Sequence, residues 1–441
     1  MVVIITALMV DMTFSTFSDI LKEQSVSSFW RLVLFITTIL TIYGAGQYFL
    51  LGFLKQISSG VRSKESYFNK LYNLLTIAQY IIAGILLLII FQILLTSHYY
   101  IVSTIAATTI SYALACIIMS LVSYRFFSWY KSSKDNTVLL YALASAMVAI
   151  STGSHLLTHN AILLEKPFVI DANLKQDFPE ISQSTIGIIA NVFLYANVLP
   201  LLLSFVLMYA GTILLLQHHS EKLGKIKFWI IICLPLISFL AGLLPTLLAL
   251  PSGGFTFYNK NFVVFRVLSI LSGTSGSILI GIAFLAIART VCKIHQNSTM
   301  VDYLAIAGYG VMMLAISIET PMYQAPYPPF GVAASASIGL MCYLYGIGIY
   351  LSAISVSEDV KLRHAIRQYV IKESKLLDSI GTAEMEQQIE KTILKITKEQ
   401  EGVLTEQTGV EPSLTEGEVK DYVETVLSEV KQMHNNYKEQ Q

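Results

Sequence analysis

The sequence has few charged residues. Asp, Glu, Lys and Arg make up 13% of its 441 residues, whereas an average soluble domain has about a quarter. Its mean hydropathy of +0.62 is too apolar for a water-soluble globule, which excludes a soluble enzyme and a disordered or low-complexity chain. The formal net charge is zero, so no basic field attracts phosphates, and we expect no nucleic-acid partner.

Cysteines are also scarce. Cys116, Cys233 and Cys342 fall within apolar stretches, and Cys292 lies at the end of one. None is placed to form an external disulfide, and their spacing matches no zinc motif. We therefore interpret them as small apolar residues.

Charge is divided unevenly along the chain. Residues 1–356 carry 18 Lys/Arg and 12 Asp/Glu, whereas residues 357–441 carry 11 and 17. This contrast predicts a boundary near Ser357. Together with the apolar stretches and loop charges described below, it predicts an extracytoplasmic N-terminal segment (1–28), a transmembrane helix bundle (29–356) and a cytoplasmic helical tail (357–441).

The bundle is predicted to be all-α, because every backbone amide in lipid must be bonded internally and a bilayer core needs roughly 20 apolar residues as helix. Nine stretches satisfy this length: Leu32–Leu54, Leu74–Thr96, Ile101–Ser123, Val138–Leu157, Ile186–Leu216, Phe228–Leu250, Phe262–Ala288, Val301–Ile318 and Val332–Ser355. The small pairs Ser272/Gly276 and Ser277/Gly281 in the seventh stretch predict close helix packing.

Loops with several positive charges alternate with loops that have few. The loops after the first, third, fifth and seventh stretches are rich in Lys or Arg, and the intervening loops are poor in them. Cytoplasmic loops carry this excess, so we expect a multi-pass cell-membrane protein with its N-terminus outside and its C-terminus in the cytoplasm.

The first 28 residues contain an apolar run, residues 2–10, that is too short to span. No basic region precedes it and no clear cleavage site follows, so we predict no cleaved signal peptide. An interfacial segment is the favoured interpretation, and a degraded tenth span is the alternative.

Polar residues at predicted outer helix ends suggest a candidate site. Arg266 and Glu319 share a depth and could form an ion pair, although two side chains that reach separately to the interface explain them as well. Tyr323 and Tyr327 flank them in a proline-rich loop, which forms either a cap on the bundle or one lip of a ligand pocket.

Histidines suggest a second candidate. His155 and His159 are spaced i, i+4, so both rings project from one helix face, which suits two ligands of a copper or zinc ion. His98 belongs to the same outer side, and Asp171, Asp177 and Glu180 could add oxygen ligands. Hydrogen-bonding histidines at the interface are the favoured alternative, and a bound cofactor is not required.

The sequence of the tail predicts short amphipathic helices. No helix breaker follows the ninth stretch, which predicts one continuous helix as far as Gly381. A second helix would begin at Thr382, and a third would begin at Thr415, where Thr415 and Glu418 form a capping box. The apolar face of each of these helices must be covered by a protein partner, a second copy of the chain, another tail helix or the inner loops. The tail has no kinase or nucleotide-binding signature, and we expect no enzymatic activity.

Four strings carry a resemblance: "HHSEKLGKIKFWII" (218–231), "APYPPFGVAAS" (325–335), "GIYLSAISVSEDVKLRHAIR" (348–367) and "ESKLLDSIGTAEMEQQI" (373–389). They resemble a paralogous set of uncharacterised multi-pass membrane proteins from ammonia-oxidising archaea, over roughly residues 125–430. The resemblance implies an archaeal cell membrane, and that body and tail act as one unit. It implies no functional residues and does not support the metal site.

Three functions are compatible with these features. The favoured one is a receptor-like or scaffolding protein that relays an outer-face signal through the ninth helix to an interaction tail. A transporter or channel for a small solute is the first alternative, and a metal-binding membrane redox protein is the second.

Overall fold

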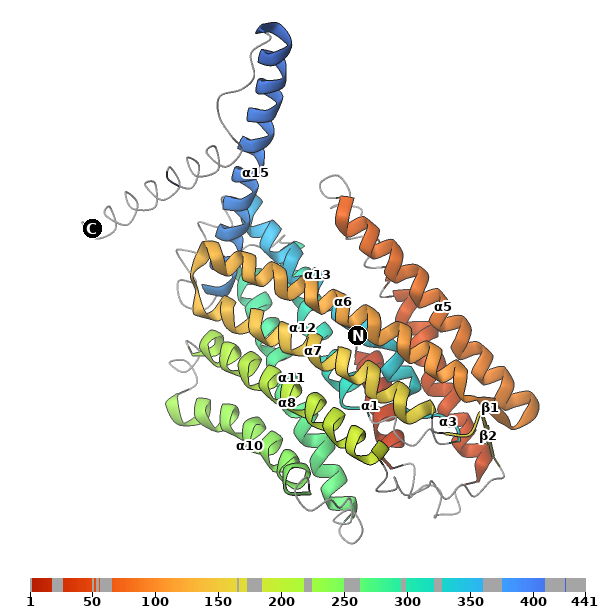
Figure 1. The fold of residues 1–441 in the computed structure, drawn as a ribbon. Coiled ribbons are helices and arrows are strands. Elements are labelled where there is room, and N and C mark those ends of the chain that lie inside the picture. The colour runs from red at the N-terminus through yellow and green to blue at the C-terminus, as the bar shows by residue number, and fades with distance from the viewer. Residues whose placement is uncertain are drawn as a thin grey trace.

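The structure is a computed structural model of the chain. It describes residues 2–17, 27–49, 51–52, 55, 66–164, 166–172, 185–217, 224–249, 262–294, 299–320, 327–359, 375–408 and 425. These residues form a bundle of long helices with one short β-ribbon (Figure 1). Eight described helices are long and apolar enough to cross a membrane, which confirms the all-α polytopic fold.

A helix occupies each of the nine predicted spans. The first comprises α3 (Ser28–Leu40) and a π-helical turn, η1 (Thr41–Gly46). The others are α5 (Ser66–Thr96), α6 (Ile101–Ser133), α7 (Asn136–Leu164), α8 (Thr185–Leu216), α10 (Lys225–Ala249), α11 (Phe262–Ile294), α12 (Thr299–Ile318) and α13 (Val332–Glu358). The described side chains of α10 cover only part of that helix, so it is the one span outside the eight.

Helix α5 exposes a broad apolar surface. Its side chains that are at least half exposed include Leu74, Ile77, Tyr80, Ile81, Leu87, Leu88, Phe91, Leu94 and Leu95. In water such a surface would be a large aggregation-prone patch. Contact with lipid acyl chains explains it, and the protein is therefore an integral membrane protein.

Helix α13 lies at the centre of the bundle. Every residue from Val332 to Ala353 is buried. A Cβ added at Gly348 would lie 2.7 Å from backbone atoms of α12, and one added at Gly339 would lie 3.0 Å from a backbone oxygen of α6. Small residues therefore bring α12 and α6 directly against the central helix.

Close packing predicted for the seventh span is also present. A Cβ at Gly276 would overlap the ring of Phe205 on α8, and one at Gly281 would meet the backbone of Gly308 on α12 at 2.8 Å. These two small residues therefore bring α11 close to its neighbours, as the sequence pattern indicates.

Segments assigned to the same side of the membrane contact one another. Strand β1 (His98–Tyr100) pairs antiparallel with β2 (Val169–Asp171), and both were assigned to the outer face. The positively charged turn after α6 meets the tail at the other end of the bundle, where the Ser379 hydroxyl donates to Asp135. The predicted alternation of sides is therefore consistent with these contacts.

The N-terminal residues form a 15-residue helix, α1 (Val2–Thr16). Leu8, Asp11 and Met12 are buried on one face of α1, which packs against η1, α12 and α13. Gly46 in η1 lies against Ile4. The sequence analysis favoured an interfacial segment here, and it did not predict that this helix packs into the bundle.

Helix α6 continues beyond the predicted span Ile101–Ser123 to Ser133, and its last three turns place Phe126 and Trp129 in the core. One prediction about a helix end is wrong. Helix α13 does not run on to Gly381. It ends at Glu358, and Asp359 has an extended backbone conformation.

The second predicted tail helix also has different bounds. One helix, α15 (Lys375–Thr408), runs without a break through Gly381 and Thr382. Gly381 is used for close packing, because a Cβ there would overlap Val356 of α13. The predicted third helix from Thr415 lies outside the described residues.

Candidate functional site: the junction between the bundle and the tail helix

Helix α15 is joined to the bundle by a buried ion pair. One guanidinium nitrogen of Arg125, on α6, donates to both carboxylate oxygens of Glu384 at 3.0 Å. The indole Nε1 of Trp129 donates to the same carboxylate at 2.8 Å. The Glu384 side chain is 1% exposed and that of Arg125 is 22% exposed. A carboxylate this buried is stable only with such charged and hydrogen-bonding partners.

Aromatic rings complete the surroundings of Arg125. Its guanidinium carbon lies 5.3 Å from the ring centroid of Tyr350 on α13 and 5.9 Å from that of Trp129. The two rings stack on each other at 6.3 Å. Cations are attracted to such ring faces, so Arg125 connects α6, α13 and α15 at one point.

Asp135 makes a second polar connection. One of its carboxylate oxygens accepts from the backbone N–H of Thr137 at 2.9 Å and thereby caps the start of α7. The other accepts from the Ser379 hydroxyl of α15 at 2.7 Å. The Gln387 amide donates to the Ser128 hydroxyl at 2.9 Å. Together with the Arg125–Glu384 pair, these contacts form what we call the tail junction.

Apolar packing supports the tail junction. Leu376, Leu377, Ile380 and Ala383 are at most 2% exposed, and Gly381 lies against Val356 near the end of α13. Burial of a Leu or Ile side chain contributes roughly 1.5–3 kcal/mol. The first three turns of α15 are therefore a fixed part of the bundle.

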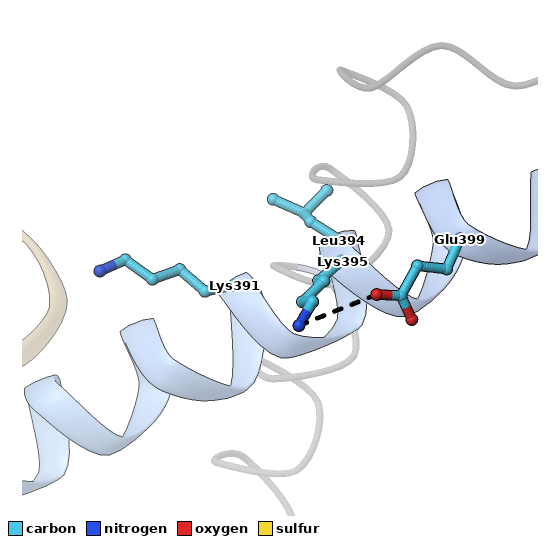
Figure 2. Close-up of a pocket in the computed structure, with 4 residues that line it drawn as sticks. All are labelled: Lys391, Leu394, Lys395 and Glu399. Carbon is cyan, nitrogen blue, oxygen red and sulfur yellow. Dashed lines mark ion pairs between the residues drawn. The ribbon is translucent and has the colours of Figure 1, made fainter. Parts of the chain in front are cut away.

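The rest of α15 projects from the bundle (Figure 1). Ile389, Ile393 and Ile396 share one face at i, i+4, i+7 and are 37%, 37% and 48% exposed. Elsewhere on this projecting half, Lys391, Leu394, Lys395 and Glu399 line a shallow groove, where Lys395 and Glu399 form an exposed ion pair at 3.8 Å (Figure 2). The projecting half thus offers an apolar face bordered by charges.

The predicted outer-face residues are only partly placed. The side chain of Arg266 and all of Tyr323 lie outside the described residues. Tyr327 lies near Ser97, Asp171 and Arg31: burial and the Asp171 carboxylate raise the pKa of its phenol, while a hydrogen bond with Ser97 and the Arg31 charge oppose the rise. Tyr327 therefore connects the proline-rich loop to the β-ribbon.

Glu319 lies just beyond the end of α12, and burial raises its pKa from 4.5 to about 7. A raised pKa means that the folded state favours the protonated form. This stabilising effect is fully present below about pH 4.5 and is lost as the pH rises to about 7.

We expect Glu319→Gln to remove this pH dependence and to raise the melting temperature relative to wild type at pH 8, by an amount equivalent to about 1–3 kcal/mol. Melting temperatures measured between about pH 4.5 and 8 test this prediction. A pH dependence in Glu319→Gln equal to that of wild type would contradict it. Exposed Glu399→Gln is the control and should retain the pH dependence.

Asp11 forms a connection at the opposite end of α13. Its carboxylate is fully buried and accepts hydrogen bonds from the backbone N–H groups of Gly331 at 2.8 Å and Ala334 at 3.0 Å. The positive end of the α13 dipole and these two N–H groups, which have no partner within the helix, favour an acidic side chain at this place. Sequence reasoning missed this residue, although a single acid in an apolar 15-residue helix was an available signal.

The histidines do not make a metal centre among the described residues. Nowhere in the described part of the chain do three His, Cys, Asp or Glu residues group so as to hold a metal ion. His155 and His159 lie together on α7 with ring centroids 5.9 Å apart. His98 lies on β1, where its Nδ1 is 2.9 Å from the Thr96 carbonyl oxygen and its Cα partner is Asp171. Asp177 and Glu180 lie outside the described residues.

The tail junction was also missed at the level of residues. The pair Arg125 and Trp129, at i, i+4 just past a predicted span, could have indicated a docking surface, but its acidic partner lies 259 residues away in the chain.

Comparison with known proteins does not identify a family for the chain. No protein-family model, no curated protein and no solved structure matches the chain.

Proposed function

We propose that this protein is a receptor-like or scaffolding membrane protein in which a change at the outer face is relayed through α13 to the projecting half of α15. The observation that carries the proposal is the tail junction, because it fixes a helix with an exposed apolar face to the central helix of the bundle. The proposal places the N-terminus outside an archaeal cell membrane and α15 in the cytoplasm, and it needs no enzymatic step.

The route of the relay replaces the one suggested by sequence. A continuous helix would have carried motion directly out of the membrane, but α13 ends at Glu358. Contact between Val356 and Gly381 and the ring of Tyr350 beside Arg125 supply the connection instead. At the outer end, Asp11 holds the first turn of the same helix. Both ends of α13 are therefore attached to elements that could respond to or report a change.

Transport is supported less well. The centre of the bundle is filled by α13, whose residues from Val332 to Ala353 are all buried. A relay needs such a rigid connection, whereas a solute path between helices needs space along the axis.

A substitution at Asp11 tests the relay. We expect Asp11→Asn to weaken the hydrogen bonds to Gly331 and Ala334, which costs about 1–3 kcal/mol, and to speed amide hydrogen exchange at residues 376–384 at the other end of α13. Exchange is followed by mass spectrometry of the full-length protein in lipid nanodiscs. Thr13→Ala, on the exposed face of the same helix, is the matched control and should leave it unchanged. Exchange at 376–384 that stays at the wild-type rate in Asp11→Asn would exclude the relay.

A further inference from the structure

Three aromatic rings lie together between α6 and α7, well away from the tail junction. Tyr112 on α6 lies 6.0 Å from His155 and 5.3 Å from His159, measured between ring centroids. The two histidine rings are 5.9 Å apart. Tyr112 is 1% exposed, His155 7% and His159 3%. We call these three residues the ring cluster.

The ring cluster lies between two contacts that join α6 to α7. These helices are antiparallel neighbours, and one turn from the cluster toward the β-ribbon the Thr109 hydroxyl donates to the Asn160 amide oxygen at 3.0 Å. In the other direction Gly153 packs against Cys116. The cluster is thus enclosed between a polar pair and a close helix contact.

His155 lacks the partners that its ring requires. Within the described part of the chain, neither of its ring nitrogens has a hydrogen-bond partner. The Ser151 hydroxyl, one turn away on the same face of α7, and the Thr104 hydroxyl, two turns from Tyr112 on α6, are buried without partners as well. Burying a polar group without a hydrogen-bond partner is unfavourable, so we expect a molecule from outside the chain to supply these bonds.

The surroundings select an uncharged molecule. Residues 101–124, 136–164 and 332–357, which form α6, α7 and α13 at this depth, contain no Asp, Glu, Lys or Arg. A charged ligand would therefore lack a counter-charge in a low-dielectric interior. A neutral imidazole offers one donor and one acceptor, so the matching ligand both donates and accepts hydrogen bonds.

We propose that the ring cluster is a binding site for a small uncharged molecule that donates and accepts hydrogen bonds. Water and a neutral hydroxyl- or amide-bearing solute share this chemistry, and a buried water typically makes about three such bonds. This inference goes beyond the proposed relay, because it assigns a ligand to a part of the bundle that the relay does not use.

Hydroxyl-radical footprinting of the purified full-length protein in nanodiscs tests the proposal with water itself as the probe. Radicals form from bound water, so we expect Tyr112, His155 and His159 to be oxidised several-fold faster than Tyr141. Tyr141 is a suitable internal reference, because it is fully buried and its hydroxyl bonds Thr212 at 3.1 Å. If a neutral solute holds the site instead, oxidation is slow, and the denatured protein releases that solute in stoichiometric amount for mass spectrometry. Slow oxidation with no released molecule overturns the proposal.

A substitution at His155 tests whether the ligand binds at the ring cluster. His155→Leu removes both unmatched groups, so oxidation of Tyr112, or release of the solute, should be lost while the protein keeps a melting temperature near that of wild type. His155→Gln keeps a donor and an acceptor and should preserve the ligand, and it serves as the second test if the leucine variant does not fold. Tyr141→Phe is the control for a substitution on the same helix. Unchanged Tyr112 oxidation or solute release in a folded His155→Leu protein would contradict the assignment.

Discussion

Replacing Glu384 with alanine is expected to release α15 from the bundle while the membrane helices remain folded. The substitution leaves Arg125 without its carboxylate and the Trp129 indole N–H without its acceptor. Removing one partner of a buried ion pair costs about 3–5 kcal/mol, and the partial exposure of Arg125 places the effect near the lower limit. Amide exchange at residues 376–383 should accordingly speed up by about 100-fold, since each 1.4 kcal/mol corresponds to a factor of ten.

The same helix offers a matched control for this experiment. Glu399 also pairs with a basic residue, Lys395, but the two side chains are 67% and 77% exposed and 3.8 Å apart. An exposed pair of this kind contributes less than about 0.5 kcal/mol. Glu399→Ala should therefore leave exchange at the tail junction unchanged. Equal effects of the two substitutions would mean that α15 is not held by the Arg125–Glu384 pair.

Adding one methyl group to the central helix is expected to destabilise the whole bundle. In Gly348→Ala the new Cβ would lie 2.7 Å from two backbone atoms of α12, the amide nitrogen of Ala307 and the carbonyl oxygen of Tyr303. Backbone atoms cannot rotate away as a flexible side chain can, so α12 and α13 must separate. We expect a loss of about 3 kcal/mol or more, measured by unfolding in detergent with increasing denaturant.

Gly84→Ala is the control for this prediction. Gly84 lies within α5, and a Cβ there meets no atom within 4 Å. Because alanine favours helix over glycine by about 0.5–1 kcal/mol, this variant should be neutral or slightly more stable than wild type. The two identical substitutions therefore have opposite expected signs. Destabilisation of Gly84→Ala to the same extent would show that the loss in Gly348→Ala does not come from the close approach of α12 to α13.

The sequence predicts the membrane architecture well because spans are read from length and hydropathy alone. Each predicted span has a helix, and the loops assigned to a common side meet through His98–Asp171 at one end and Ser379–Asp135 at the other. These features depend on local composition and on the flanking cations, which one sequence contains in full.

Helix ends and long-range contacts could not be predicted in the same way. The continuity expected after Val356 depended on the lack of a local helix breaker, but the packing of α15 back onto α13 needs α13 to stop. Gly381 was interpreted as the end of a helix, but it lies within the second turn of α15, where it permits a close approach to α13. Arg125 with Glu384, and Asp11 with Gly331, join residues hundreds of positions apart, and no periodicity reports such pairs.

Cysteine cross-linking in membranes tests the docking of α15 most directly. The Gln387 amide nitrogen lies 2.9 Å from the Ser128 hydroxyl, so Ser128→Cys with Gln387→Cys should be joined by a short bifunctional thiol reagent that spans the length lost when Gln387 is shortened. Ser120→Cys with Gln387→Cys, in which the α6 position lies two turns nearer the start of that helix, should not. Cross-linking of the first pair alone is the result that the account predicts. No cross-link at the first pair, or equal cross-linking of both, would contradict a tail helix fixed to the bundle.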